Sequence, residues 1–214
     1  MNYNDFRKKF QSLPIFTSKD VVRLQPDKQA VRNQINRWQA KGLLIQLKRG
    51  LYAFDEIDRK VDLNLHFIAN NLYAPSYISL ESALNFYGLI PEKAVDLTSV
   101  TTKKTAIFKN KLGVFIYQHI KPNALRGFRQ VKDNSGYTFF IAEPEKAIVD
   151  FFYLNLSRFK PKDRDIFEVS YRFQNIEGLK VLKILEYANL FNNLKLLKVC
   201  QNFCRFIKKE AKND

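Results

Sequence analysis

The side chains best suited to recognising another molecule lie between residues 28 and 49. The first group is polar and basic, and it consists of Lys28, Gln29, Arg32, Asn33, Asn36 and Arg37. From Lys28 to Gly42 the sequence contains no acidic residue, although a solvated helix face usually mixes glutamate with lysine. Amide and guanidinium groups have forked donors and acceptors that match base edges in the DNA major groove. The group predicts contact with a nucleic acid, and an ordinary exposed polar helix is the alternative.

A second basic group, Lys48 and Arg49, stands beside Gly50 in the segment LLIQLKRGLYAF at positions 43–54. The segment predicts a β-hairpin with Arg49 and Gly50 as its two-residue turn, because glycine readily adopts the positive φ that such a turn requires. A basic tip gains charge-assisted contacts with phosphates and releases counterions. Without a polyanionic partner, the same tip would be an ordinary soluble turn.

A group of carboxylates near residue 150 raises a catalytic alternative. The group comprises Glu143, Glu145, Lys146 and Asp150, with Asp96 upstream. Carboxylates bind Mg²⁺ and a lysine can hold a phosphate, so the group could belong to a magnesium-dependent nuclease. Such nucleases commonly have a carboxylate two residues before the lysine, and Pro144 occupies that position. The spacing is more typical of a helix start, where acids interact favourably with the helix dipole. We expect no catalytic residue, no metal site and no enzyme.

The remaining reactive side chains do not form a recognisable set. His66 and His119 lack the serine, cysteine or aspartate partners of nucleophilic catalysis, and no glycine-rich phosphate loop is present, so we expect no cofactor. Cys200 and Cys204 lie four residues apart in a helical-looking stretch, where the geometry disfavours a disulfide. We expect a cytoplasmic protein without a membrane partner. The cysteines are expected to be reduced, the start MNYNDFRKKF has no apolar segment, and no apolar run is long enough for a membrane span.

The whole chain is strongly basic. It has 214 residues, with 36 Lys and Arg against 21 Asp and Glu, and a formal net charge of +15 at pH 7. Such a charge points to a polyanionic partner, most often a nucleic acid and sometimes a membrane surface. A bias toward Lys, Asn, Ile and Phe is the compositional alternative. With 46% hydrophobic residues the chain can bury a substantial core, and its length suits one large domain or two smaller ones.

Residues 1–57 are predicted to form the first domain. Helices are expected over 4–13, 16–24 and 27–41, followed by the hairpin over 43–54. Thr17 or Ser18 caps the second helix and Gly42 ends the third. The hairpin face that carries Leu43, Ile45 and Leu47 is expected to pack on the helices. Three helices followed by a hairpin are the element order of a winged helix-turn-helix, in which the third helix enters the major groove and the hairpin is the wing.

Residues 58–214 are predicted to form a mixed α+β domain with a helical C-terminal tail, so the fold class is α+β. Helices are expected over 58–73, 79–89 and 143–156. Strands are expected over 94–102, 105–109, 113–120, 127–132 and 136–142. The tail, from about residue 164, is expected to form three further helices.

The second domain contains a long stretch without acids, from Leu97 to Lys132. Six of its basic residues form a candidate second patch: Lys103, Lys104, Lys109, Lys111, Arg126 and Arg129. The patch could bind a second stretch of polyanion. The alternative is a solvated sheet edge, where lysine discourages edge-to-edge pairing with another sheet.

Three segments together resemble a known family. They are AVRNQINRWQAKGLLIQLKRGLYAF at 30–54, YISLESALNFYGLIP at 77–91 and FFIAEPEKAIVDFFYL at 139–154. In this order they resemble the AbiEi-type antitoxins of type IV abortive-infection toxin–antitoxin systems. The matching positions of the last segment are Ile141, Ala142, Glu145, Lys146, Ala147 and Asp150. The resemblance covers roughly residues 15–155.

The resemblance implies a DNA-binding antitoxin. Such a protein represses its own operon by binding inverted repeats in its promoter, as double-stranded DNA, through the winged helix. Its C-terminal domain neutralises a nucleotidyltransferase-like toxin without forming a stable complex. The second basic patch would then contact DNA beside the winged helix or a nucleic acid held by the toxin. A ligand-responsive winged-helix regulator without a toxin partner is the second hypothesis.

Overall fold

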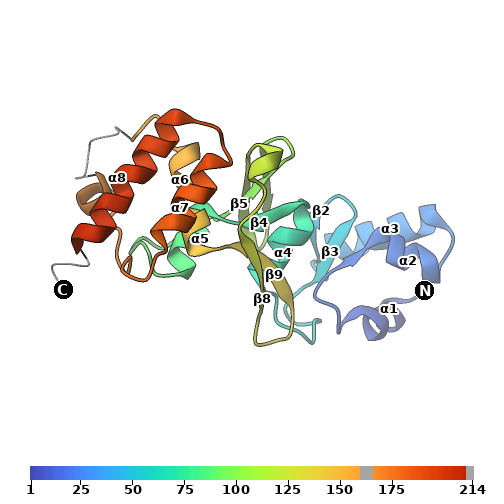
Figure 1. Cartoon of the computed structure of the whole chain (residues 1–214). Coiled ribbons are helices and arrows are strands. Elements are labelled where there is room, and N and C mark those ends of the chain that lie inside the picture. Colours follow the sequence, from blue (N-terminus) through green and yellow to red (C-terminus); the bar gives the residue numbers. More distant parts are fainter. Residues whose placement is uncertain (160–165, 211–214) are drawn as a thin grey trace.

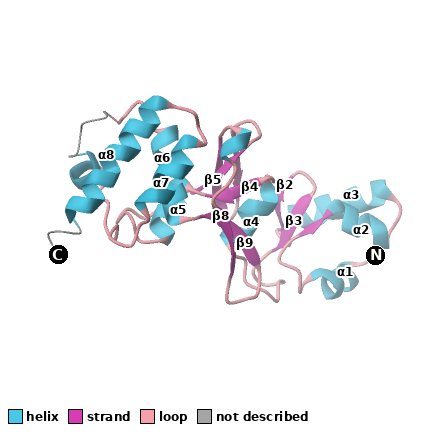
Figure 2. Ribbon diagram, in the orientation of Figure 1, coloured by secondary structure: helices cyan, strands magenta, loops and turns pink. Residues whose placement is uncertain are grey.

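The computed structural model describes residues 1–159 and 166–210 and shows a mixed α+β protein with two β-sheets. In Figure 1 the N-terminal helices lie at one end of the molecule, a six-stranded sheet occupies the middle, and the last helices lie at the other end. Figure 2 shows that most of the helical segments gather at the two ends, while α4 (Leu65–Leu72) lies beside the central sheet. The predicted α+β class is confirmed at this level.

The N-terminal unit contains three helices and a small antiparallel sheet with the strand order β1-β3-β2. Its elements are α1 (Tyr3–Phe10), β1 (Phe16–Thr17), α2 (Ser18–Leu24), α3 (Lys28–Ala40), β2 (Leu44–Lys48) and β3 (Leu51–Phe54). Thr17 caps α2 and forms a reciprocal capping box with Asp20. The Asp27 carboxylate accepts from two amides at the start of α3, and Gly42 beyond its end has a φ of +73°. The predicted three helices and hairpin are therefore present, and α1 ends three residues earlier than expected.

Aromatic rings fill the interior of this unit. The ring of Phe6 stacks on Trp38 of α3 with centroids 4.5 Å apart, and it also contacts Phe16 and Phe54 of the small sheet. Buried aromatic pairs add to the free energy gained from apolar burial alone. These contacts fix α3 against the hairpin.

The β2–β3 hairpin turns at Arg49 and Gly50 as predicted, and Gly50 has a φ of +79°. Its packing differs from the prediction. Ile45 and Leu47 pack in the core of the second domain instead of on the N-terminal helices. Leu43 packs against the N-terminal core as predicted. Leu44 of β2 packs there too, together with Tyr52 and Phe54 of β3, because this face of the hairpin points toward the helices. The hairpin is thus buried on both faces.

The second domain is built on a mixed sheet with the strand order β6-β7-β5-β4-β9-β8. Its strands are β4 (Ser76–Ile78), β5 (Leu97–Thr101), β6 (Ala106–Asn110), β7 (Gly113–His119), β8 (Phe128–Lys132) and β9 (Thr138–Ala142). Its α-helices are α4 (Leu65–Leu72), α5 (Leu80–Phe86), α6 (Pro144–Leu154), α7 (Val181–Asn189) and α8 (Leu194–Glu210). Tyr117 of β7 donates to the Ala69 carbonyl of α4 on one face of the sheet, and α5 and α6 cover the other face.

Several predicted boundaries are wrong. The helix expected from residue 58 begins at Leu65, because the Asn64 side chain caps it and Asp58 is drawn back to Tyr3 and Arg7 of α1. The short strands β1 and β4 were not predicted. The tail has two α-helices and a π-helical turn (Ile166–Ser170) in the described residues, and its expected start near residue 164 lies outside them.

A buried polar cluster joins the sheet to α6. Lys146 and Asp150, one turn apart on α6, form an ion pair with no exposed side-chain surface on either partner. The hydroxyls of Tyr77 and Ser79 donate to the second carboxylate oxygen of Asp150 at 3.0 and 2.8 Å. Burial lowers the pKa of Lys146 and raises the pKa of Asp150, so the pair depends on these mutual contacts to stay charged.

We expect the substitutions Lys146→Met and Asp150→Asn each to lower the free energy of unfolding by about 3–5 kcal/mol, because each leaves an unpaired buried group. The double variant should lose less than the sum, since no uncompensated charge remains in it. Urea unfolding of all four proteins measures the coupling.

The exposed pair Glu92 and Arg172 provides the control for this cycle. Its Glu92→Gln variant should lose at most about 1 kcal/mol, because solvent screens the pair. Additive losses at Lys146 and Asp150 would contradict the coupling.

Candidate nucleic-acid interface

The outer face of α3 carries the polar residues singled out in the sequence. Val31, Ile35 and Trp38 are buried on its inner face. The six predicted residues of α3, namely Lys28, Gln29, Arg32, Asn33, Asn36 and Arg37, are all exposed. The aromatic packing beneath the helix therefore presents the whole polar stripe to solvent.

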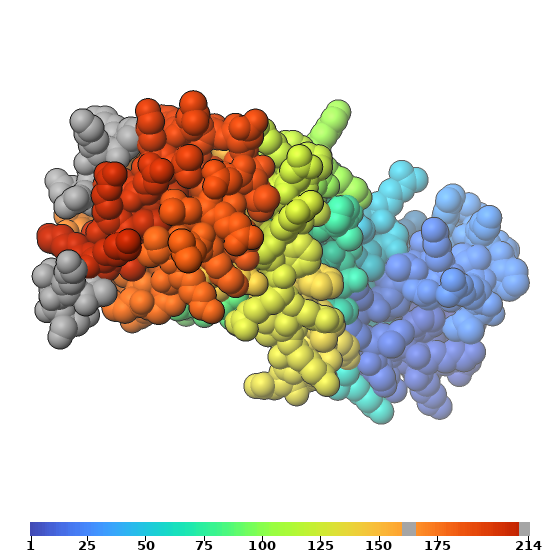
Figure 3. Space-filling view, viewed as in Figure 1, coloured from blue at the N-terminus to red at the C-terminus, as the bar shows by residue number. Residues whose placement is uncertain are grey.

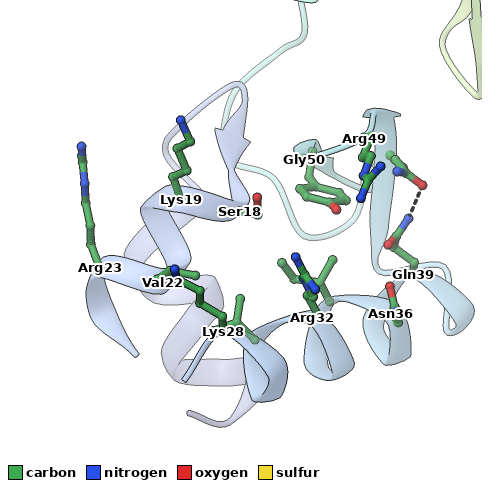
Figure 4. Close-up of a pocket in the computed structure, with 14 residues that line it drawn as sticks. Ser18, Lys19, Val22, Arg23, Lys28, Arg32, Asn36, Gln39, Arg49 and Gly50 are labelled. Carbon is green, nitrogen blue, oxygen red and sulfur yellow. Dashed lines mark hydrogen bonds between the residues drawn. The ribbon is translucent and has the colours of Figure 1, made fainter. Parts of the chain in front are cut away.

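A groove of about 690 Å³ runs between α2, α3 and the β2–β3 hairpin. The charged residues that line it are Lys19, Arg23, Lys28, Arg32 and Arg49, and none of the acidic residues within the described ranges lines it. Figure 4 shows Arg32 rising from α3 toward the hairpin, which carries Arg49 and Gly50 on the other wall. Five cations around one groove favour a polyanionic ligand, because their mutual repulsion is relieved when phosphates replace the counterions.

The predicted residues divide between the groove and the helix surface beside it. Lys28, Arg32, Asn36 and Arg49 line the groove. The others, Gln29, Asn33 and Arg37, form a neighbouring stripe on α3. There the Gln29 amide donates to the Asn33 side chain at 3.1 Å, and the Arg37 Nε donates to the Asn33 carbonyl at 3.3 Å. The two stripes together form one hydrophilic surface.

The structure adds residues that the sequence reasoning missed. Lys19 and Arg23 lie four residues apart on α2, so both face the groove. The four-residue spacing of the two cations is visible in the sequence, and it is the signal that could have placed them on one face of α2. The side chain of Gln39 donates to Gln46 at 3.1 Å and links α3 to β2 at the inner end of the groove (Figure 4).

Lys48 lies apart from this surface, although it neighbours Arg49 in the chain. Its ammonium donates to the Leu72 carbonyl at 2.5 Å and to the Asn71 carbonyl at 3.4 Å, at the C-terminal end of α4. Burial, together with nearby Lys103, lowers the pKa of Lys48. A cation interacts favourably with the negative end of a helix dipole. The contacts of Lys48 therefore indicate a structural role instead of the predicted phosphate contact.

The second basic patch is divided by the order of the strands. Lys109 belongs to β6 and Arg129 to β8, which are the two opposite edges of the six-stranded sheet. Lys103, Lys104 and Lys111 flank β6, and Arg126 precedes β8. Arg129 also lies over the ring of Tyr87, 5.5 Å from its centroid. The six residues therefore do not form one patch.

Three of the carboxylates considered for a nuclease, those of Glu143, Glu145 and Asp150, contact neighbouring protein groups. Glu143 accepts from Lys183 at 2.5 Å and from Tyr187 at 2.9 Å, and Glu145 accepts from the Lys180 amide at 3.0 Å. Asp150 is buried in the cluster described above. Within residues 1–159 and 166–210, no group of three or more His, Cys, Asp or Glu side chains is placed to hold a metal.

Cys200 and Cys204 are buried and not joined by a disulfide, and burial raises the pKa of the Cys204 thiol to about 11. His66 stacks on Phe139, and burial lowers its pKa. His119 donates through Nδ1 to the Lys103 carbonyl at 2.9 Å. None of the helices in the described part of the chain is long and apolar enough to cross a membrane.

The groove and the outer face of α3 are thus the surface with the clearest chemistry. They combine five cations, which suit phosphates, with amide side chains, which suit base edges. Comparison of the sequence with models of protein families and with curated proteins gave no match in either case.

Proposed function

We propose that this protein is a sequence-specific DNA-binding antitoxin of the type IV class. In this proposal residues 1–57 are a winged helix, α3 is the recognition helix and the β2–β3 hairpin is the wing. The observation that carries it is the acid-free groove between α2, α3 and the hairpin, with Lys19, Arg23, Lys28, Arg32 and Arg49 around it. A winged helix places its third helix in the major groove and its wing beside the phosphates, which fits these side chains.

The antitoxin part of the proposal rests on the resemblance of the three sequence segments. The structure brings the second and third of them into direct contact, since Tyr77 and Ser79 of one donate to Asp150 of the other. This contact explains why the two segments belong together in one fold. The second domain would then act against a nucleotidyltransferase-like toxin without a stable complex, while the winged helix represses the shared operon in the cytoplasm.

One observation favours the ligand-responsive regulator as a second candidate. A cavity of about 420 Å³ lies in the second domain, which is within the size range of small-molecule sites. Its lining includes Leu80, Ile90, Asp96, Thr98, Ile116 and Gln118. A regulator of this kind would release DNA on binding a small molecule and would have no toxic neighbour gene.

Base reading by α3 is tested with duplex DNA from upstream of the gene. Arg32→Ala and Asn33→Ala should each weaken binding to the operator by about 1–3 kcal/mol and reduce discrimination against a scrambled duplex, because each removes a donor or acceptor from a base edge. Gel shifts with both duplexes measure this. Lys9→Ala, an exposed change on α1, is the control. Unchanged discrimination in both variants would show that α3 does not read bases.

The two basic residues of the hairpin tip should behave differently. Arg49→Ala should weaken binding to every duplex and reduce the salt slope by about 0.9, the value for one lost phosphate contact. Lys48→Ala should leave that slope unchanged and lower the free energy of unfolding by about 0.5–1.5 kcal/mol, because it loses its bond to Leu72. DNA titrations across a salt series measure the slope for both variants, and urea unfolding measures their stability. A reduced slope for Lys48→Ala would contradict its assignment.

The toxin relationship is tested by co-expression with the neighbouring downstream gene. That gene alone should arrest growth, and the full chain should restore it. The Arg32→Ala/Arg49→Ala variant should still restore growth while losing repression of an operon reporter, since the antitoxin activity is assigned to the second domain. A downstream gene that is harmless on its own would remove the antitoxin proposal and leave the regulator.

A further inference from the structure

The β8–β9 hairpin exposes two phenylalanine rings on one face. The residues Phe128 and Phe140 are 37% and 42% exposed, and their ring centroids lie 5.6 Å apart in an edge-to-face arrangement. The register pairs Phe128 with Ala142, Gln130 with Phe140, and Lys132 with Thr138. Paired residues of adjacent strands point to the same side, so these six side chains share one face. Figure 3 shows this hairpin, in yellow, projecting from the body of the molecule.

The exposed rings are held in place from below. Phe128 stacks on Tyr77 of β4 with centroids 4.8 Å apart, because Ala142 on the intervening strand is small enough to let the ring reach across. Tyr77 is itself fixed by its hydrogen bond to buried Asp150. The aromatic pair is therefore preorganised, which lowers the entropy lost when a ligand stacks on it.

The charges around this face are positive. Arg126 precedes β8 and Lys132 ends it, and both are exposed. Two neighbouring acids, Asp133 and Glu143, are engaged by other groups of the protein. Asp133 accepts from Asn64 and from the Tyr137 amide, and Glu143 accepts from Lys183 and Tyr187. A second copy of this chain would bring these like charges together, whereas a polyanion with flat bases would satisfy both the rings and the cations.

We propose that the β8–β9 face binds single-stranded nucleic acid. Two successive bases stack on Phe128 and Phe140, the Gln130 amide opposite Phe140 meets a base edge, and Lys132 and Arg126 hold phosphates. Exposed aromatic rings on a sheet face, next to basic residues, are a known way to bind single strands with little sequence preference.

This surface is separate from the groove at α3. The N-terminal hairpin meets the sheet on the β6 side, where Asn110 donates to the Leu47 carbonyl at 3.2 Å. β8 is the opposite edge of that sheet. The face therefore goes beyond the proposed operator binding and can fail independently of it.

Fluorescence anisotropy with labelled 15-nucleotide dT and rU strands tests the proposal on the full chain. The Phe128→Leu/Phe140→Leu variant keeps apolar bulk but removes the flat rings, so its affinity for both strands should fall about tenfold or more, as expected for the loss of two stacking contacts. Its affinity for duplex DNA should stay within about twofold. The Arg32→Ala/Arg49→Ala variant should show the reverse pattern, and failure of duplex binding alone would count only against the operator proposal.

Phe86→Leu is the matched control, because Phe86 is 43% exposed on α5 and contacts His66 instead of this face. It should bind single strands like the unchanged protein. Photocrosslinking with 5-iodouracil strands, followed by peptide mapping, should locate the contact at residues 128–140 even if the leucine variant is unstable. Equal single-strand affinity in all variants, or crosslinks confined to the α3 groove, would overturn the proposal. So would a leucine variant that changes only the oligomeric state in light scattering.

Discussion

The arrangement of this molecule depends on one hairpin that belongs to two hydrophobic cores. Leu44, Tyr52 and Phe54 of the β2–β3 hairpin pack with the N-terminal helices. Ile45 and Leu47, on the other face of the same hairpin, pack in the core of the second domain. Because each face is covered by a different unit, neither unit can shift without exposing apolar surface of the hairpin. The groove at α3 therefore has a fixed position relative to the six-stranded sheet.

This shared burial also decides what the basic tip can do. A β-bulge between Gln46 and Lys48 interrupts the alternation of β2. Lys48 therefore pairs with Leu51, on the side of the hairpin that faces the second domain, and does not follow Gln46 toward the groove. Lys48 is turned toward the end of α4, where carbonyl groups need a donor, and Arg49 is left at the groove wall. Of the two basic residues at the hairpin tip, Lys48 is thus structural and Arg49 is exposed at the groove. Residue type alone could not separate the two roles.

The sequence predicted best where the signal is local. The ends of α3 follow from Asp27 and Gly42, and its inner face follows from the spacing of Val31, Ile35 and Trp38. β1 and β4, with two and three residues, are too short to show an alternating pattern. The start of α4 depends on contacts between Asp58 and α1, which are distant in sequence. Strand order is also non-local, and it is the reason that one acid-free segment supplies cations to opposite edges of the sheet.

The buried cluster around Asp150 joins two of the three segments on which the sequence resemblance rests. The segment at 139–154 supplies Lys146 and Asp150, and the segment at 77–91 supplies Tyr77 and Ser79. A carboxylate removed from water needs every nearby donor, so these side chains constrain one another across more than sixty residues of sequence. The polar groups of these four side chains bond to one another inside the protein and do not face a ligand. The two segments therefore act as a signature of the fold of the second domain. The same cluster also fixes the place of an exposed side chain, since Tyr77 lies beneath Phe128.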